Sequence, residues 1–222
     1  MADALKDGKY IKNPAVVTRA DTDFKGMKDD EIEKLKLKDA IQMHRDTKIA
    51  IENYVADNNL NPVKPTILVS CKDTTHAKSI FDYVTSDEFY DGEFKEKALQ
   101  IDSTSKTDEQ VEQLLTLEKP VNFIEIVIHV NMLKEGWDVT NLYTIVPLRA
   151  SNASILVEQT IGRGLRLPFG GERTGVEKVD KLTVVAHDNF SRVIEAAQNP
   201  NSILNKVKFV EIDADQLNDR TE

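Results

Sequence analysis

The chain has 222 residues, of which 40% are apolar and 30% charged, and a formal net charge of −9. These values fit one large soluble domain or one and a half small ones. The acidic balance argues against a protein that binds nucleic acid with its whole surface, although a few phosphate contacts in a local groove do not set the total charge.

The composition also excludes several kinds of site. The single cysteine, Cys71, rules out an internal disulfide and a cysteine-based metal cage, and the four histidines show no ligand spacing. We therefore predict no metal site in this chain. The N-terminus lacks the apolar core of a signal peptide, and no apolar run reaches the ~20 residues of a membrane helix. We expect a cytoplasmic protein with no membrane contact.

The first part of the chain is predicted to be an arm followed by helix. Residues 1–28 are polar and mixed, and they indicate an extended arm with a short strand near Ala15–Thr18. Residues 29–59 carry apolar residues spaced for one or two helices. Asn and Pro residues then break the pattern. We assign residues 1–59 to an N-terminal arm and helical segment, and residues 60–222 to the main domain.

Short apolar strands alternate with helices in the rest of the chain. The predicted strands are Thr66–Ser70, Ala98–Asp102, Glu125–Val130, Leu142–Pro147, Leu182–Ala186 and Lys206–Ile212. The predicted helices are Asp73–Thr85, Thr107–Leu117, Ala153–Leu167 and Asn189–Ala197. Thr107 is expected to cap its helix, with Gln110 three residues later. This alternation predicts a three-layer α/β fold with a mostly parallel central sheet covered on both faces.

An arginine cluster is the most informative local feature. In L-V-E-Q-T-I-G-R-G-L-R-L-P, the residues Gln159, Gly162, Arg163 and Arg166 fall on one side of a helix. Two guanidiniums on one face suit a polyanion such as a nucleoside triphosphate. In α/β sheets ligands bind at the carboxyl ends of the strands, so we expect this cluster and Gly136–Asp138 to lie at that edge.

These motifs resemble those of a known family. E-G-W-D-V and Q-T-I-G-R-G-L-R-L-P resemble motifs V and VI of superfamily-two helicases, and the longer wording is similar to the Res subunit of type III restriction enzymes. T-I-L-V-S-C-K-D, at residues 66–73, stands where that family has motif IV. The resemblance covers roughly residues 60–197 and implies a second RecA-like domain.

The resemblance also implies roles for individual residues. Arg163 and Arg166 would be arginine fingers that reach the γ-phosphate of ATP held by a first domain, with Arg166 meeting the transition state. Gly136, Asp138, Gln159 and Gly162 would contact the nucleotide or shape its site. The positions that would grip the nucleic-acid backbone are Ser70, Cys71, Lys72, Ser103, Thr104, Asn131, Met132 and Leu133.

The sequence departs from that family in one respect. It contains no phosphate-binding loop of the G-x-x-x-x-G-K-[ST] type and no D-E-x-H or D-E-A-D box, which hold the phosphates and Mg²⁺. The chain is thus predicted to be half of a motor and inactive alone. ATP and Mg²⁺ would be held mainly by a first RecA-like domain upstream or in another subunit. The resemblance further implies DNA as ligand, a methyltransferase subunit as partner, and a nuclease domain beyond residue 222.

Simpler interpretations stand beside these. Arg163 and Arg166 could form a solvated basic face, and Asp138 could be a turn or capping carboxylate. His129 is expected to be a core histidine, whereas His187 is either structural or close to the cleft. The Gly-rich stretch 170–175 follows a helix, so we predict a loop there rather than a phosphate cradle. The alternative to a motor domain is a non-catalytic RecA-like module that docks a partner protein or nucleic acid.

Overall fold

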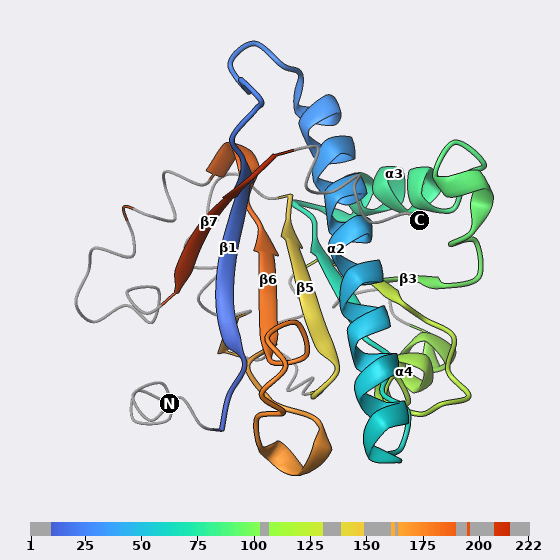
Figure 1. The fold of residues 1–222 in the computed structure, drawn as a ribbon. Helices are drawn as coiled ribbons and strands as arrows, with labels where there is room; N and C mark the ends of the chain where they lie inside the picture. The colour runs from blue at the N-terminus through green and yellow to red at the C-terminus, as the bar shows by residue number, and fades with distance from the viewer. Residues whose placement is uncertain are drawn as a thin grey trace.

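The computed structural model describes residues 10–102, 107–130, 139–148, 161–162, 164–189, 195 and 207–213. Within these residues, seven strands form one sheet in the order β3-β4-β2-β5-β6-β1-β7 (Figure 1). Every pair of neighbouring strands is parallel. The strands are β1 (Asn13–Arg19), β2 (Thr66–Ser70), β3 (Ala98–Asp102), β4 (Ile126–Val130), β5 (Leu142–Pro147), β6 (Lys181–Val185) and β7 (Lys208–Ile212).

Helices cover both faces of this sheet. The described helices are α2 (Asp29–Asn58), α3 (Thr74–Val84) and α4 (Asp108–Leu115). One core contains α2 and α3 side chains together with Ile67 and Val69 of β2. The other core contains Leu114 of α4 together with Leu68, which points to the opposite face of the same strand. Because β2 is buried on both faces, its sequence is a continuous apolar run rather than an alternating one. The three-layer RecA-like arrangement is confirmed.

The predicted elements agree closely with the observed ones. The strands predicted at Thr66–Ser70, Ala98–Asp102 and Leu142–Pro147 coincide with β2, β3 and β5, and the other strands differ by one or two residues at one or both ends. Residues 29–58 form one helix of 30 residues. The capping of α4 is also confirmed, since Thr107 Oγ1 accepts from Gln110 N at 3.2 Å and Thr107 N donates to Gln110 Oε1 at 2.9 Å. Most of the helices predicted at 153–167 and 189–197 lies outside the described residues.

The N-terminal segment belongs to the same core as the rest of the chain. β1 pairs with β6 on one side and with β7 on the other. Val17 of β1 packs in the same core as Leu37 and Ile41 of α2. The boundary expected between residues 59 and 60 therefore does not coincide with a division of the core.

Candidate functional site

The carboxyl edge of the sheet holds one group of predicted contact residues. Ser70 and Cys71, at the end of β2, are each only 2% exposed, whereas Lys72 is exposed. Ser70 Oγ lies 2.6 Å from Nε2 of His129, at the end of β4, which confirms His129 as a buried core histidine. Burial raises the pKa of Cys71 to about 12, so its thiol is neutral and inert. Of Ser70, Cys71 and Lys72, only Lys72 is exposed to solvent.

Many of the other predicted site residues lie outside the described part of the chain. They are Ser103, Thr104, Asn131, Met132, Leu133, Gly136, Asp138, Gln159 and Arg163. Gly162 is helical and half-buried. Among the described residues, no group of three or more His, Cys, Asp or Glu side chains could hold a metal ion, and no helix is both long and apolar enough to cross a membrane.

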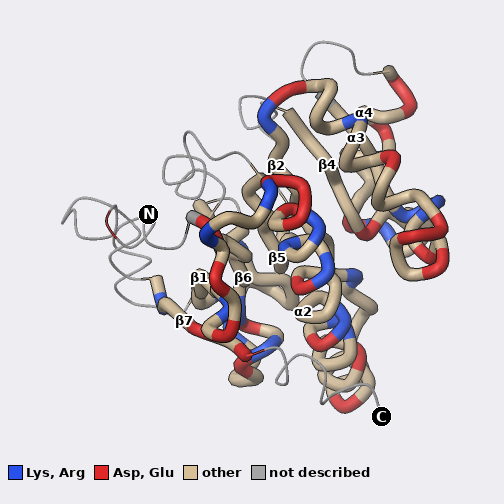
Figure 2. The backbone as a smooth tube through the Cα atoms, turned by 90° about the horizontal axis from the view of Figure 1, so that it is seen from above, with Lys and Arg blue, Asp and Glu red and all other residues tan. Residues whose placement is uncertain are grey.

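A polar stripe on α2, formed by Lys36 and Asp39, packs against the carboxyl ends of β1, β5 and β6. Both acidic and basic residues occur along this helix (Figure 2). Lys36 is 1% exposed; its Nζ donates to the carbonyl oxygen of Pro147, at the end of β5, at 3.1 Å, and it forms an ion pair with Asp188. Burial lowers the pKa of Lys36, and the negative charge of Asp188 opposes this effect. Through these contacts the polar stripe holds α2 against the carboxyl ends of the strands.

Asp39 is the most heavily bonded member of this stripe. Its carboxylate accepts from Arg19 Nε and Nη2, at the end of β1, with both bonds at 2.7 Å, and lies 2.9 Å from His187 Nε2. Burial alone would raise the pKa of Asp39, but the bonds from Arg19 and His187 outweigh it and hold this pKa below its ordinary value. His187 is 3% exposed and stacks on Phe24, so its role is structural.

Arg166 lies at the other end of the sheet. Its side chain is exposed. The carbonyl oxygen of Leu165 accepts from the backbone N–H of Lys12 at 2.8 Å, and Lys12 comes directly before β1. Lys12 Nζ also donates to the carbonyl oxygens of Leu142, at the start of β5 (2.9 Å), and Gly164 (3.3 Å). This places Gly164–Leu165 at the amino edge, and the expectation that Arg166 lies at the carboxyl edge is wrong.

The reason lies in how parallel strands are connected. A helix between two parallel strands leaves the carboxyl edge of the first strand and runs back to the amino edge of the second. Arg166 stands at the end of the predicted helix Ala153–Leu167, whose helical turns stop at Gly164. Arg166 and Lys72 therefore lie at opposite edges of the sheet.

Solved structures share this architecture. A fragment of a putative HsdR subunit of a type I restriction enzyme from Vibrio vulnificus YJ016 is 16% identical, with a TM-score of 0.52 over 91% of this chain and 36% of that one. Dbp5 from S. cerevisiae, bound to RNA and ADP BeF3, is 13% identical, with a TM-score of 0.52 over 95% of this chain and 43% of that one. The chain therefore has a RecA-like α/β fold. It spans less than half the length of either of these two chains. Neither family models nor curated proteins match the sequence.

Lys12 fixes the arginine-bearing segment of this RecA-like domain. Its side chain is 0% exposed, donates to Thr140 O at 2.6 Å as well as to Leu142 and Gly164, and lies 4.2 Å from the centre of the Tyr143 ring. Burial lowers the pKa of Lys12 to about 7, against the opposing charge of Glu118. This role of Lys12 could not be predicted from the sequence, because Lys12 lies in the predicted arm.

A glycine also sets the position of this segment. A Cβ on Gly164 would lie 2.8 Å from both δ-carbons of Leu182, which is itself fully buried. A close backbone approach is thus needed at Gly164, where the end of the helix meets β6. The sequence Gly162-Arg163-Gly164 contains a second glycine beside the arginine, and this glycine could have been predicted to pack closely against the sheet.

The Gly-rich stretch is a loop built around a carboxylate. Gly170, Gly171 and Gly175 have φ of +84°, +83° and +81°, in the left-handed region that favours glycine. Asp180 accepts from the N–H of Thr174 at 2.9 Å and from the N–H of Gly175 at 2.8 Å. The prediction of a loop is confirmed, and these two N–H groups are already bonded to Asp180 instead of being directed at a phosphate.

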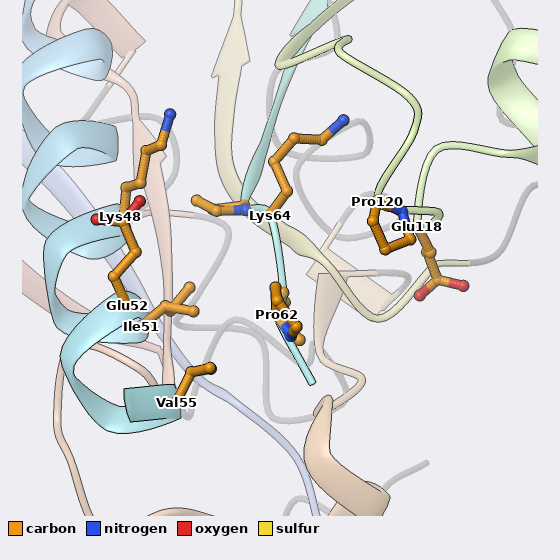
Figure 3. Close-up of a pocket in the computed structure, with 10 residues that line it drawn as sticks. Lys48, Ile51, Glu52, Val55, Pro62, Lys64, Glu118 and Pro120 are labelled. Atoms are coloured by element: carbon orange, nitrogen blue, oxygen red, sulfur yellow. The ribbon is translucent and has the colours of Figure 1, made fainter. Parts of the chain in front are cut away.

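The amino edge also carries a pocket of about 210 Å³ between α2 and the segment that precedes β2 (Figure 3). Lys48 and Lys64 extend toward the same side, while Glu118 points away from them. Burial lowers the pKa of Lys64 to about 8. The pocket is otherwise mainly apolar and is lined by none of the predicted site residues.

Glu125 anchors α2 above this pocket. Its carboxylate lies 3.1 Å from Nε2 of His44 and 3.1 Å from Nζ of Lys48, both on α2, and 3.5 Å from Nζ of Lys97. Burial alone would raise the pKa of Glu125, but the hydrogen bond with His44 and the charge of Lys48 lower it to about 2. The carboxylate therefore stabilises the folded state only while it is ionised.

We expect the contribution of Glu125 to stability to disappear in acid. Because its folded pKa of about 2 lies below the unfolded value of about 4.3, this stabilisation is full above pH ~4.3 and is lost as the pH falls toward 2. Urea unfolding of the wild type and of Glu125→Gln at pH 7, 5.5, 3.5 and 2.5 measures it. The difference in unfolding free energy between the two proteins should be largest at pH 7 and mostly gone at pH 2.5. A difference that does not change with pH would contradict the assignment.

Proposed function

We propose that this chain is the second motor domain of an ATP-dependent DNA helicase or translocase, of the kind found in the restriction subunit of type III restriction-modification systems. One observation carries the proposal: Arg166 is exposed at the edge of a RecA-like sheet, within a sequence that resembles helicase motif VI. The similarity to Dbp5 and to the HsdR fragment supports a helicase-type domain at the level of fold. The narrower assignment to the restriction subunit of a type III system rests on the resemblance of the sequence motifs.

In this proposal Arg166, together with Arg163, completes an ATP site that another domain builds. Phosphoryl transfer spreads negative charge over the γ-phosphate oxygens, and an arginine brought in from a second domain stabilises that charge. The first domain would have to approach the amino edge, because Arg166 lies there. ATP and Mg²⁺ would be held mainly by that domain, since this chain has no sequence of the phosphate-binding type.

Nucleic acid would bind at the opposite edge. Lys72 is exposed two residues after the end of β2 and precedes Asp73, whose side chain caps α3. With a net charge of −9, the domain would bind DNA through a local track of this kind rather than through its overall field. A methyltransferase subunit as partner and a cytoplasmic location are part of the same proposal.

The test compares this chain with a protein that also contains the first motor domain. ATP hydrolysis is measured with and without double-stranded DNA, and with RNA as a second polymer. We expect DNA-stimulated hydrolysis by the longer protein and none above background by this chain alone. Turnover by the isolated chain would overturn the division into two half-sites. Stimulation by RNA alone would overturn DNA as the ligand, and no stimulation by either polymer would overturn the motor.

A non-catalytic RecA-like module is the second candidate. It is favoured by the acidic net charge and by the missing phosphate-binding loop. The reading frame upstream of this segment separates the two candidates. A P-loop and a D-E-x-x box in frame support the motor, whereas a start codon with no motor domain nearby supports the module.

A further inference from the structure

Three large apolar side chains are exposed within one short stretch of the chain. Leu115, Val121 and Phe123 are 75%, 75% and 74% exposed, the highest values among the large apolar residues that the structure describes. Single exposed apolar residues are normal on a protein surface. A group of them is different, because it indicates a contact surface.

The stretch that carries Val121 and Phe123 is held in place. Asn122, between them, is 9% exposed, and its Nδ2 donates to Gln113 O at 2.7 Å and to Thr116 Oγ1 at 3.1 Å. Its Oδ1 accepts from the N–H of Ile124 at 2.9 Å. Asn122 and Ile124 therefore point inward, and Val121 and Phe123 are directed to solvent by a fixed backbone.

Val121 and Phe123 line a groove of about 390 Å³ beside α4. This volume lies in the range, about 300–1,000 Å³, in which ligand pockets are found. The groove also has a marked charge, because Glu96, Glu109 and Glu112 line it together with a single cation, Lys119. Exposed apolar side chains and three carboxylates thus line the same groove.

This charge decides between possible occupants. Nucleic acid is excluded, since its phosphates would meet three carboxylates. A second copy of this chain would bring the same carboxylates together across a two-fold axis, which is unfavourable. Strand addition at the sheet edge is also hindered, because the carbonyl oxygen of Gln100 in the edge strand β3 already accepts from Gln110 Nε2 at 2.9 Å.

We propose that the groove beside α4 binds an amphipathic helix of a partner protein, with an apolar face that covers Val121 and Phe123 and lysines or arginines that meet Glu96, Glu109 and Glu112. Helices commonly bind in this way, with apolar residues at i, i+3, i+4 and i+7 inserted into a groove. The site lies apart from Lys72 and Arg166 in the sequence, and the inference does not depend on the proposed function.

Binding is tested with two labelled helical peptides that share leucines at i, i+3, i+4 and i+7. One carries lysines at the remaining positions and the other carries glutamates. Fluorescence anisotropy is followed on the wild-type chain, on Val121→Ser/Phe123→Ser, on Glu96→Lys/Glu112→Lys, and on Ile49→Ser. Ile49 is the control, because it is an apolar residue on α2 that is 54% exposed and lies outside the groove. Circular dichroism checks that each variant is folded.

We expect the leucine–lysine peptide to bind the wild type and Ile49→Ser equally, and the double serine variant about tenfold or more weakly. The Glu96→Lys/Glu112→Lys variant should bind the leucine–glutamate peptide more tightly than the leucine–lysine peptide, the reverse of the wild type. Equal binding to the wild type and the serine variant, or no binding to either, would overturn the proposal. So would a wild-type dimer in light scattering that the serine substitutions dissociate, because the groove would then be occupied by a second copy.

Discussion

Replacing Arg166 by alanine in a protein that carries both motor domains should lower nucleic-acid-stimulated ATP hydrolysis by about 10³-fold. The expected loss is in kcat, with little change in the KM for ATP, because the phosphates of the ground state would be held by the other domain. Arg166 is exposed at the amino edge of the sheet, where a neighbouring domain can reach it. Steady-state ATPase assays at saturating DNA measure the effect.

Arg45→Ala is the matched control for this experiment. Arg45 is another partly exposed arginine, paired with Glu93 at 2.6 Å and stacked over Tyr90 on a different part of the surface. Its removal should leave kcat unchanged and lower stability by no more than about 1 kcal/mol. If Arg166→Ala turns over ATP at the wild-type rate, Arg166 is not an arginine finger, whatever the fold.

Asp39→Ala should destabilise the fold by about 3–5 kcal/mol, the usual effect of breaking a buried ion pair. The substitution removes the acceptor of both Arg19 bonds and of the His187 contact, and His187 is almost fully buried. Arg19 would then hold its charge in a partly buried site without the carboxylate that compensates it. Urea unfolding at pH 7, followed by circular dichroism, measures the change.

Asp82→Ala is the control here, since Asp82 forms only an exposed i,i+4 pair with Lys78 on α3. Its loss should change the unfolding free energy by about 0.5 kcal/mol or less. A loss of under 1 kcal/mol for Asp39→Ala would show that the contacts at the end of β1 contribute little to holding α2 on the sheet.

The sequence allowed most of the sheet to be predicted, because its interior strands are buried on both faces. β2 and β5 are mostly continuous apolar runs, and the predicted first and last residues of both strands match the observed ones. β1 was predicted as a strand, but its place inside the sheet was not. Its partners β6 and β7 lie more than 160 residues further along the chain, and no local pattern encodes such a pairing.

The candidate site was harder to predict than the fold. Arg166 lies at the amino edge because it stands at the end of a crossover connection, whereas the prediction placed the whole connection at the carboxyl edge. Lys12 could not have been identified, because a buried lysine is recognised only by the carbonyl groups that surround it. Asp39 and Lys36 did leave a signal, since they lie three residues apart on one stripe of a predicted helix.

The position of β1 limits how this protein can be shortened. A fragment that began at residue 60 would lack both β1 and α2, and β7 would lose the one strand to which it is paired in the described sheet. β6 would become an edge with unpaired backbone groups, and the core beneath α2 would be open to water. Such a truncated protein is expected to aggregate, so expression vectors for the domain should retain the coding sequence from the N-terminal segment onward.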